Sequence, residues 1–422
     1  MRLNKFLIIT IILILLMIPI TSFADTNQIT TYSPSCILID ANSGKIIYEK
    51  NIYKKMYPAS TTKIMTAILI IENCNLSEVA TVSSNAVSAE SVPDGYVRAH
   101  LKAGESFTIE QLLNVLLIPS ANDVAIVLAE HLAGSINNFS DLMNKKASEI
   151  GCQNTHFVNP NGLHNENHYS TVYDMSLIAK YAMNNETFRS IVCRTSCSLP
   201  ATDIYPSDDR TFDTTNELLL DDKNKDTNCF YEYANGIKTG YTKEANYCLA
   251  ASAKKDNNEF IAITFGNKQK IDGKSERATD CINLFNYAIE NYKDKKILSK
   301  DTLVKQIEIN TKSSNSQAFE TQLLDVVIED DITIKTAANV ETISPNIIID
   351  TDLKAPILKG TVIGKIECEV DGTIYSSNLI ANNNIVDSSY IQYIFYALLI
   401  LLFVIILFTF IHHKHKKREW YL

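Results

Sequence analysis

The chain has 422 residues, 46% of them hydrophobic, and a formal charge of −9. This length exceeds one average domain, and the composition is apolar enough for two folded units with real cores. Arg2 and Lys5 contribute two positive charges and the last nine residues a net three, so the remainder carries about −14, which argues against nucleic acid as a partner and against adhesion to anionic polymers.

Residues 1–24 have the three parts of a secretory signal peptide. Arg2 and Lys5 form a basic start, an apolar run covers residues 6–20, and Ser22-Phe23-Ala24 supplies a small-x-small cleavage site. The sequence therefore predicts an exported protein.

The next stretch mixes strands with helices. The periodicities predict strands over residues 36–40, 46–48, 236–240, 247–253 and 260–265, and helices over residues 60–71, 109–117, 122–132, 138–151, 171–183 and 280–292. Pro119 interrupts the central helices, so Ser120 and Asn122 are expected on a short connection. Residues 194–230 are polar and are predicted to be irregular. We expect one α/β (α+β) domain over residues 28–295, whose antiparallel sheet takes its edges from both ends of the segment and is flanked by helices.

The following residues differ in pattern. Residues 293–300 are charged and are predicted to be a linker. Short alternating segments at residues 304–309, 323–328, 332–335, 346–349 and 362–370 predict a small all-β C-terminal domain over residues 300–375. Residues 376–389 are rich in asparagine and are predicted to be a flexible stalk.

The last segment has the length and polarity of a membrane span. Residues 390–411 are almost entirely apolar, which is long enough to cross a bilayer. Residues 412–422 contain a cluster of histidines, lysines and an arginine, which favours the cytoplasmic side. The sequence thus predicts a single-pass protein of the cell membrane, with its folded part outside the cell.

The nine cysteines indicate neither a disulfide framework nor a metal site. Their number is odd and they are scattered, so most are expected to be small buried hydrophobes. The close pair Cys193 and Cys197 lacks companion ligands, and His164 and His168 lie in an asparagine-rich loop without a third ligand. We therefore predict no metal and no cofactor.

Ser60 and Lys63 are the candidate catalytic pair. Pro58 and Ala59 lead into the predicted helix, so Ser60 lies in its first turn and Lys63 lies one turn later on the same face. A serine hydroxyl is a weak nucleophile until a base takes its proton, and a lysine on an apolar helix can have its pKa lowered enough to act as that base.

Two further motifs follow in order. Ser120 and Asn122 form Ser-x-Asn on the predicted loop, and Lys238-Thr239-Gly240 lies on a predicted strand. Ser-x-x-Lys also occurs at Ser252, but there a strand would place the two side chains on opposite faces. The order Ser-x-x-Lys, Ser-x-Asn, Lys-Thr-Gly is typical of class A β-lactamases and penicillin-binding proteins.

The residues around these motifs extend the likeness. They read Pro-Ala-Ser60-Thr-Thr-Lys-Ile-Met-Thr, Pro-Ser120-Ala-Asn-Asp, Phe157-Val-Asn-Pro-Asn-Gly-Leu, His168-Tyr-Ser-Thr-Val-Tyr-Asp-Met and Asn235-Gly-Ile-Lys-Thr-Gly-Tyr-Thr. The chain resembles the serine D-alanyl-D-alanine carboxypeptidases, the low-molecular-weight penicillin-binding proteins of peptidase family S11, over roughly residues 32–292. The segment Lys359-Gly-Thr-Val-Ile-Gly-Lys is similar to that family's second domain. The resemblance implies a serine β-lactamase/transpeptidase-like fold.

The resemblance also implies a reaction. Ser60 would attack the carbonyl between two D-alanines at the end of a peptidoglycan stem peptide, form an acyl-enzyme and release D-alanine, with Lys63 as its base. Ser120 would relay a proton, and Asn122 would bind the substrate backbone. β-Lactam antibiotics would acylate the same serine.

The third motif would hold the substrate. Lys238 and Thr239 suit a free C-terminal carboxylate, and Gly240 lets the substrate approach the sheet edge. The backbone N–H groups of Ser60 and Tyr241 would form the oxyanion hole. Many family members carry histidine where this chain has Tyr241, so any role of that imidazole is in doubt here.

Three other functions remain open at this stage. A β-lactamase of class A needs a glutamate that positions water, and the candidate Glu217 lacks the Glu-x-x-Leu-Asn form. An endopeptidase acting on cross-links could use the same residues. A catalytically silent penicillin-binding receptor would keep the fold and lose the nucleophile, whereas all three motifs are present.

Overall fold

A computed structural model describes residues 29–221, 229–268, 270–271, 274–312, 319–336, 344–370, 373–386 and 388–418. The predicted signal peptide, residues 1–24, lies outside the described residues, as do the last four residues of the tail. The chain divides into two compact units, Met1–Glu290 and Asn291–Leu422.

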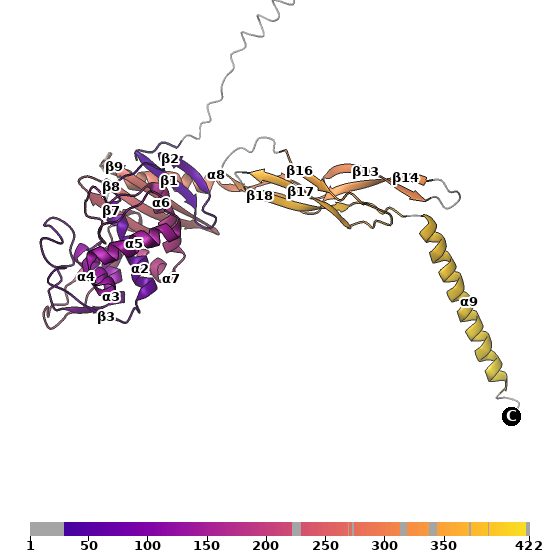
Figure 1. Ribbon diagram of the computed structural model, residues 1–422, viewed down its shortest axis with the longest axis horizontal. Coiled ribbons are helices and arrows are strands. Elements are labelled where there is room, and N and C mark those ends of the chain that lie inside the picture. Colours follow the sequence, from indigo (N-terminus) through magenta and orange to yellow (C-terminus); the bar gives the residue numbers. More distant parts are fainter. Residues whose placement is uncertain are drawn as a thin grey trace, which may run out of the picture. The chain divides into compact units, whose positions relative to one another are not determined.

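The first unit contains a five-stranded antiparallel sheet (Figure 1). Its strands are β1 (Ser35–Asp40), β2 (Ile46–Lys50), β7 (Ala234–Thr242), β8 (Asn246–Lys255) and β9 (Asn258–Asn267). They lie in the order β2-β1-β9-β8-β7, so the edge strand β2 comes from the early part of the unit and the edge strand β7 from its late part. The predicted sheet is therefore confirmed, and the Lys-Thr-Gly motif lies on an edge strand.

Helices surround this sheet. They are α2 (Lys63–Asn73), α3 (Ile109–Leu117), α4 (Asn122–Ala133), α5 (Ile136–Ile150), α6 (Val172–Met183), α7 (Glu186–Val192) and α8 (Glu276–Asn291). Figure 1 shows α2, α3, α4, α5 and α7 gathered in a helical lobe, while α6 packs against β1 and β9. One apolar core joins the two parts, because Ile37 of β1 and Ile263 of β9 belong to the same buried cluster as Ile64 and Met65 of α2.

Local signals set the ends of the central helices. Thr108 forms a capping box with Gln111 at the start of α3. Pro119 separates α3 from α4, and Gly134 ends α4 with φ at 72°. Ser120 lies in the predicted connection, whereas Asn122 is already the first residue of α4.

Short elements fill the remaining loops. They are η1 (Ala59–Thr62), η2 (Glu217–Leu219), and the strand pairs β3 (Val79–Thr81) with β4 (Ser106–Thr108), β5 (Ser196–Ser198) with β6 (Thr211–Asp213), and β10 (Lys270–Ile271) with β11 (Lys274–Ser275). The prediction that residues 194–230 are irregular is wrong for β5, β6 and η2. The prediction failed because it treats polar residues as exposed, whereas Arg210 is buried and forms an ion pair with Glu105 at 3.0 Å.

Helix α8 is attached to the start of the sheet through Asp280. Its carboxylate accepts hydrogen bonds from the backbone N–H of Tyr32 at 2.9 Å and of Ser33 at 2.7 Å. Asp280 is fully buried. This attachment fixes the first turn of α8, where Arg277 lies.

The second unit is all-β apart from one terminal helix. A five-stranded sheet has the order β13-β14-β18-β17-β16, and β12 pairs with β15. The strands are β12 (Lys293–Leu298), β13 (Leu303–Lys312), β14 (Phe319–Ile328), β15 (Ile332–Thr336), β16 (Asn346–Ile349), β17 (Val362–Val370) and β18 (Thr373–Ala381). The predicted all-β C-terminal domain is confirmed.

Two predictions in this unit are wrong. The expected linker at residues 293–300 contains β12, and the expected stalk at residues 376–389 begins inside β18, which lies between β14 and β17. The asparagine-rich composition of residues 376–389 predicts a flexible stalk, but two of these asparagines instead accept hydrogen bonds from the backbone of other segments. Asn383 accepts a hydrogen bond from the backbone N–H of Asp325 at 2.8 Å, and Asn384 accepts one from that of Lys359 at 2.7 Å.

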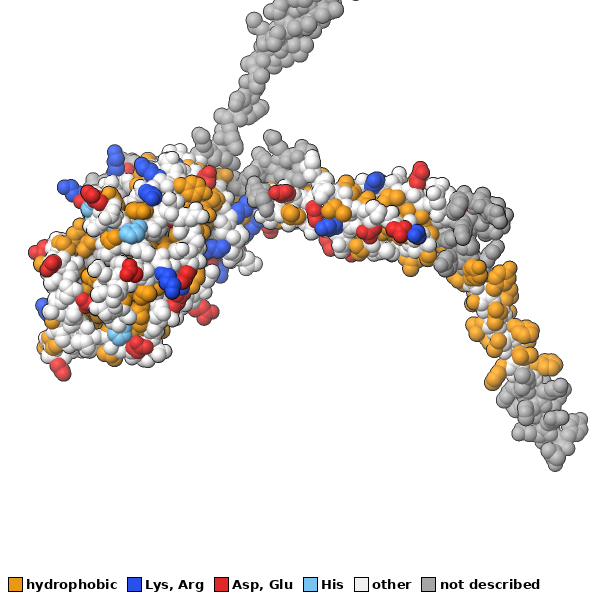
Figure 2. Space-filling view, viewed as in Figure 1, with side chains coloured by type: hydrophobic (Ala, Val, Ile, Leu, Met, Phe, Trp, Pro, Cys, Tyr) orange, Lys and Arg blue, Asp and Glu red, His pale blue; other side chains and the backbone are white. Residues whose placement is uncertain are grey.

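Helix α9 (Ser388–Arg418) follows the second sheet. Its segment Tyr393–Phe410 has a mean hydropathy of 2.8, with no part of it buried within the protein. Figure 2 shows hydrophobic side chains over the described surface of this helix. The helix is long and apolar enough to span a membrane.

Candidate active site

Ser60 and Lys63 meet where a short helix turns into a longer one. Ser60 lies in η1, and Lys63 is the first residue of α2. The Lys63 Nζ lies 2.8 Å from Ser60 Oγ. The sequence placed Ser60 in the first turn of an α-helix, whereas that turn is a 3₁₀ helix whose first residue, Ala59, has φ at 48°. Non-glycine residues in this backbone region often mark functional sites.

The Lys63 amine is held in a fully buried position. Its Nζ lies 2.8 Å from Asn122 Oδ1 and 2.8 Å from the carbonyl oxygen of Asn161. The amide of Asn122 is oriented by its own hydrogen bond, from Nδ2 to the carbonyl of Val97 at 2.9 Å. Two pure acceptors therefore face the amine, and Ser60 provides the third contact.

Burial, together with the positive charge of Lys238, lowers the pKa of Lys63 well below its usual value of 10.5, and Asp123 opposes this only in part. A neutral amine has two hydrogens and one lone pair. In that form the hydrogens would satisfy the two carbonyl acceptors, and the lone pair would face the Ser60 hydroxyl, which lies 2.8 Å from Nζ. This arrangement can take the hydroxyl proton, which is the step that makes serine nucleophilic.

Helix α4 presents the second motif. Ser120 precedes the helix with φ at 72° and is 6% exposed, and Asn122 is its first residue. Within the part of the chain that the structure describes, the Ser120 hydroxyl has no hydrogen-bond partner. Burial raises the pKa of the neighbouring Asp123, whose carboxylate accepts the backbone N–H of Ala99 at 2.9 Å and so anchors the start of α4.

The third motif lies on β7, beside η1. A Cβ placed on Gly240 would come within 3.0 Å of the Ser60 backbone nitrogen, so the strand passes close to the serine. Thr239 is 5% exposed and its hydroxyl lies 2.5 Å from that of Thr215, whereas the Tyr241 side chain is 52% exposed.

Lys238 lies in the protein interior. It is 1% exposed, and its ammonium donates a hydrogen bond to the Thr239 carbonyl at 3.1 Å. Burial and the nearby charge of Arg277 lower the pKa of Lys238 to about 7. Lys238 is therefore absent from the cavity lining, while the next residue, Thr239, is part of it.

A cavity of about 240 Å³ joins these residues. The described residues that line it are Ser60, Gly95, Tyr96, Val97, Ser120, Asn122, Gly162, Leu163, Thr215, Thr239, Gly240, Tyr241, Thr242, Tyr247 and Arg277. Six of the eight predicted site residues are among them, and the other two, Lys63 and Lys238, are buried behind its walls. The cavity is large enough for the end of a peptide.

The sequence did not reveal Arg277 or its pairing with Glu217. The Arg277 guanidinium lines the cavity and donates to both carboxylate oxygens of Glu217, each at 3.0 Å. Burial raises the pKa of Glu217, but the charge and hydrogen bonds of Arg277 outweigh it and leave the pKa below its usual value. No local pattern marks this pair, since its members lie 60 residues apart.

Asn161 was also missed as a site residue, because its contribution is a backbone carbonyl. Two side chains fix the loop around Asn161, one from the loop and one from α2. Asn159 accepts the backbone N–H of Gly162 at 2.7 Å, and Thr66 of α2 donates to the carbonyl of Pro160 at 2.6 Å. The turn-rich sequence Asn-Pro-Asn-Gly was the available signal.

Gly240→Ala is expected to slow acylation of Ser60 roughly tenfold with little loss of stability. The added Cβ would lie 3.0 Å from the Ser60 nitrogen and 3.1 Å from the Pro58 carbonyl, so strand and serine must separate by a few tenths of an ångström. Small misplacements in a catalytic geometry are costly in rate. The rate of labelling by a fluorescent penicillin measures the effect on acylation, and urea unfolding of the same variant shows whether its stability is kept.

His168 is expected to make the first unit acid-sensitive. It is 1% exposed, its Nδ1 accepts the backbone N–H of Val158, and its Nε2 therefore donates to Thr62 Oγ1 at 2.9 Å. Burial, with the charges of His156 and His164, lowers the pKa of His168 from 6.5 to about 3.

The sign of this effect follows from where the proton binds. Below pH 6.5 the unfolded chain takes up a proton at His168, and the folded chain does so only near pH 3. The free energy of unfolding should therefore fall by up to about 1.4 kcal/mol per pH unit in this window. Urea unfolding at pH 7 and pH 5 should show a smaller loss for His168→Gln than for the wild type. Equal losses would contradict the prediction.

Comparison with known proteins agrees with this geometry. A family described as D-alanyl-D-alanine carboxypeptidase matches residues 22–269, and one described as penicillin-binding protein 5, C-terminal domain, matches residues 292–387. The chain is 30% identical over 360 residues to D-alanyl-D-alanine carboxypeptidase DacF of Bacillus subtilis, covering 84% of this chain and 86% of that protein. It is 28% identical to D-alanyl-D-alanine carboxypeptidase DacA of Haemophilus influenzae, covering 83% of this chain and 84% of that protein.

Solved structures show the same likeness. The DD-transpeptidase of Streptomyces K15 is 30% identical, with a TM-score of 0.55 over 62% of this chain and 98% of that chain. Penicillin binding protein 5 from Haemophilus influenzae is 26% identical, with a TM-score of 0.58 over 85% of this chain and 98% of that chain. The second likeness extends over most of both units.

Proposed function

The chain belongs to the D-alanyl-D-alanine carboxypeptidases, and we propose that it removes the terminal D-alanine from peptidoglycan stem pentapeptides through an acyl-enzyme on Ser60. The observation that carries this proposal is the contact of 2.8 Å between Ser60 Oγ and a buried lysine amine, at a cavity that also exposes Thr239 and Arg277. These features support Ser60 as the nucleophile, Lys63 as its base, and Thr239 with Arg277 as the contacts for the substrate's carboxylate.

Acylation begins when Lys63 takes the Ser60 proton. The Ser60 oxygen then attacks the carbonyl carbon of the penultimate D-alanine, and the backbone N–H groups of Ser60 and Tyr241 stabilise the oxyanion. As the C–N bond breaks, the proton passes from Lys63 through the Ser120 hydroxyl to the leaving amine. Water later hydrolyses the ester, with Lys63 again the base. Burial of the lysine and the position of Ser120 on the cavity wall support these roles.

The terminal carboxylate of the substrate is held at the far end of the cavity. Thr239 offers a hydroxyl there and Arg277 a guanidinium, while Lys238 adds positive charge from behind the wall. A bound carboxylate favours the protonated form of Lys238, whose pKa of about 7 leaves it only partly charged at neutral pH in the free protein. Asn122 is positioned to bind the peptide backbone as well as the lysine.

Class A β-lactamase chemistry fits this site less well. Such an enzyme needs a free carboxylate that orients the deacylating water. Both oxygens of Glu217 accept hydrogen bonds from Arg277. The acyl-enzyme that a β-lactam forms is therefore expected to be hydrolysed slowly, which gives a long-lived penicillin adduct.

The test uses the full chain purified in detergent. A peptide ending in D-Ala-D-Ala is offered beside the same peptide with an amidated C-terminus. Free D-alanine from the first peptide, D-alaninamide from the second and the lifetime of a fluorescent penicillin adduct are measured. Release of D-alanine from the free acid alone, together with a long-lived adduct, is the expected result. Neither an adduct nor D-alanine release would indicate a silent receptor. Rapid loss of the adduct would indicate a β-lactamase, and equal cleavage of the amidated peptide an endopeptidase. A lasting adduct without release of D-alanine would contradict the carboxypeptidase activity.

We further propose that α9 anchors the chain in the cell membrane with the catalytic unit outside. The apolar segment Tyr393–Phe410 and the basic cluster that follows it in the sequence support this orientation. Alkaline carbonate washing should leave the full chain in the membrane fraction and should release a chain that ends at Val386. A full chain extracted by carbonate would contradict the anchor.

A further inference from the structure

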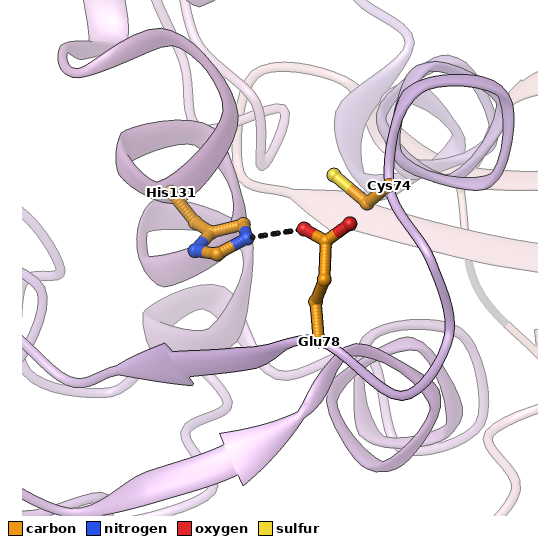
Figure 3. A group of neighbouring side chains, drawn as sticks. All are labelled: Cys74, Glu78 and His131. Atoms are coloured by element: carbon orange, nitrogen blue, oxygen red, sulfur yellow. Dashed lines mark hydrogen bonds and ion pairs between the residues drawn. The ribbon is translucent and has the colours of Figure 1, made fainter.

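A cysteine, a glutamate and a histidine meet on the first unit, away from the catalytic cavity. Cys74 is the residue that ends α2, Glu78 lies just before β3, and His131 is in the last turn of α4. Their Sγ, carboxylate and imidazole atoms all lie within 4.8 Å of one another. Figure 3 shows the Glu78 carboxylate between the imidazole and the thiol, with both facing it.

We propose that Cys74, Glu78 and His131 form a zinc-binding site, with water as the fourth ligand. Thiolate, imidazole and carboxylate are the three ligand types that proteins use for Zn²⁺. Ligand atoms around a tetrahedral zinc are roughly 3.5 Å apart. The separation of 3.2 Å between His131 Nε2 and Glu78 Oε2 already meets this requirement, and small side-chain rotations bring in the Cys74 sulfur.

The carboxylate is held in place for this task. Glu78 Oε1 accepts the backbone N–H of Asn75 at 2.8 Å, while Oε2 faces His131. One oxygen is thus fixed by the turn, and the other is directed toward the metal position. Supporting hydrogen bonds of this kind orient the ligands of known metal sites.

The site is accessible to an ion. The side chains of His131 and Glu78 are 25% and 42% exposed, and Cys74 is half-buried. When zinc binds, the thiol gives up its proton to solvent. The imidazole also gives up the Nε2 proton that it donates to Glu78 and carries its proton on Nδ1 instead, so that Nε2 can bind the metal. The zinc replaces the hydrogen bond between His131 and Glu78.

The position of the site gives it a structural role. Helices α2 and α4 begin at Lys63 and Asn122, whose side chains are hydrogen-bonded to each other. Two of the zinc ligands, Cys74 and His131, lie at the other ends of the same two helices, roughly 14–16 Å away by the rise of an α-helix. Zinc would therefore join the two helices at the end opposite the catalytic contact, too far away to take part in the reaction.

The sequence did not reveal this set. Cys74 and Glu78 lie four residues apart, but His131 is 53 residues beyond Glu78. Zinc patterns are recognised by closely spaced cysteines and histidines, and only the fold brings these three residues together.

The test uses the full chain in detergent, kept reduced and stripped of metal with a chelator. Dialysis against Zn²⁺ should load one zinc per chain, and Co²⁺ as a probe should give a thiolate-to-metal charge-transfer band. Zinc should also raise the melting temperature by a few degrees, since only the folded chain holds the complete site.

Three variants test the ligands one at a time. Cys74→Ser, Glu78→Gln and His131→Asn should each weaken zinc binding more than about tenfold, since loss even of a supporting partner costs roughly 10–100-fold. Cys197→Ser, at another half-buried cysteine, and His100→Asn, at an exposed histidine whose φ of 55° suits asparagine, should bind like the wild type.

Two results would overturn the proposal. One is a wild-type chain that binds no zinc when Zn²⁺ is in excess. The other is a Cys74→Ser or His131→Asn variant that keeps both the wild-type affinity and the zinc-dependent rise in melting temperature. Circular dichroism of each metal-free variant separates loss of the site from loss of the fold.

Discussion

Ser60→Ala is expected to reduce D-alanine release roughly 10⁶-fold and to abolish the covalent penicillin adduct. Removing the nucleophile of a serine hydrolase has an effect of this size because no other group can form the acyl-enzyme. The fold should persist, since Ser60 is only partly buried and alanine removes one hydroxyl. Free D-alanine measures turnover, and mass spectrometry of the chain after incubation with a penicillin measures the adduct.

Ser252→Ala is the matched control for this experiment. Ser252 begins the other Ser-x-x-Lys sequence, but it lies in β8, fully buried, with no partner for its hydroxyl among the described residues. Loss of an unsatisfied buried hydroxyl should leave stability unchanged or slightly improved. An adduct that persists in Ser60→Ala and disappears in Ser252→Ala would reverse the assignment of the nucleophile.

Lys63→Met is expected to slow acylation of Ser60 by roughly 10²–10⁴-fold, the usual contribution of a general base. Methionine keeps most of the apolar stem but has no amine to accept the proton. It also removes the donor to Asn122 Oδ1 and leaves the Asn161 carbonyl with only the longer contact to Ser60 Oγ at 3.4 Å. A buried group left without a partner costs about 1–3 kcal/mol. Rapid mixing with a chromogenic penicillin measures the acylation rate, and urea unfolding measures the stability separately.

The pH dependence of the wild type gives a second check on Lys63. Its lowered pKa means that the amine becomes neutral, and thus able to act as a base, at a lower pH than an ordinary lysine does. The acylation rate should therefore reach its plateau well below pH 10.5 and should fall as the pH drops through the pKa of Lys63. Lys255→Met, at the lysine of the other Ser-x-x-Lys sequence, should keep the wild-type profile. A rate that rises only near pH 10 would mean that Lys63 is charged in the folded protein.

Much of the catalytic site could be predicted because its motifs are local. Ser60 and Lys63 are three residues apart, which places them on one side of a helical turn whether that turn is α or 3₁₀. Residues 238–241 are consecutive on one strand. The partners that complete the site follow no such rule: the Asn161 carbonyl is a backbone atom, and Arg277 meets Glu217 across 60 residues.

The failed predictions also have physical causes. Residues 376–381 form part of an interior strand although their composition favours a stalk. Polar side chains satisfied by distant partners look the same in sequence as polar side chains exposed to water. Arg210 shows this most plainly, since it is buried against Glu105 in a segment predicted to be irregular.

The sequence by itself determined the order of the elements, the antiparallel sheet, the all-β second domain and the three motifs, because hydrophobic periodicity and motif spacing are properties of neighbouring residues. Only the tertiary structure decided how far the pKa of Lys63 is lowered and whether Cys74 meets Glu78 and His131. A pKa depends on burial and on charges nearby in space, such as that of Lys238. A set of metal ligands likewise depends on which helix ends the fold brings together. Neither property can be predicted from residues that are neighbours in the sequence.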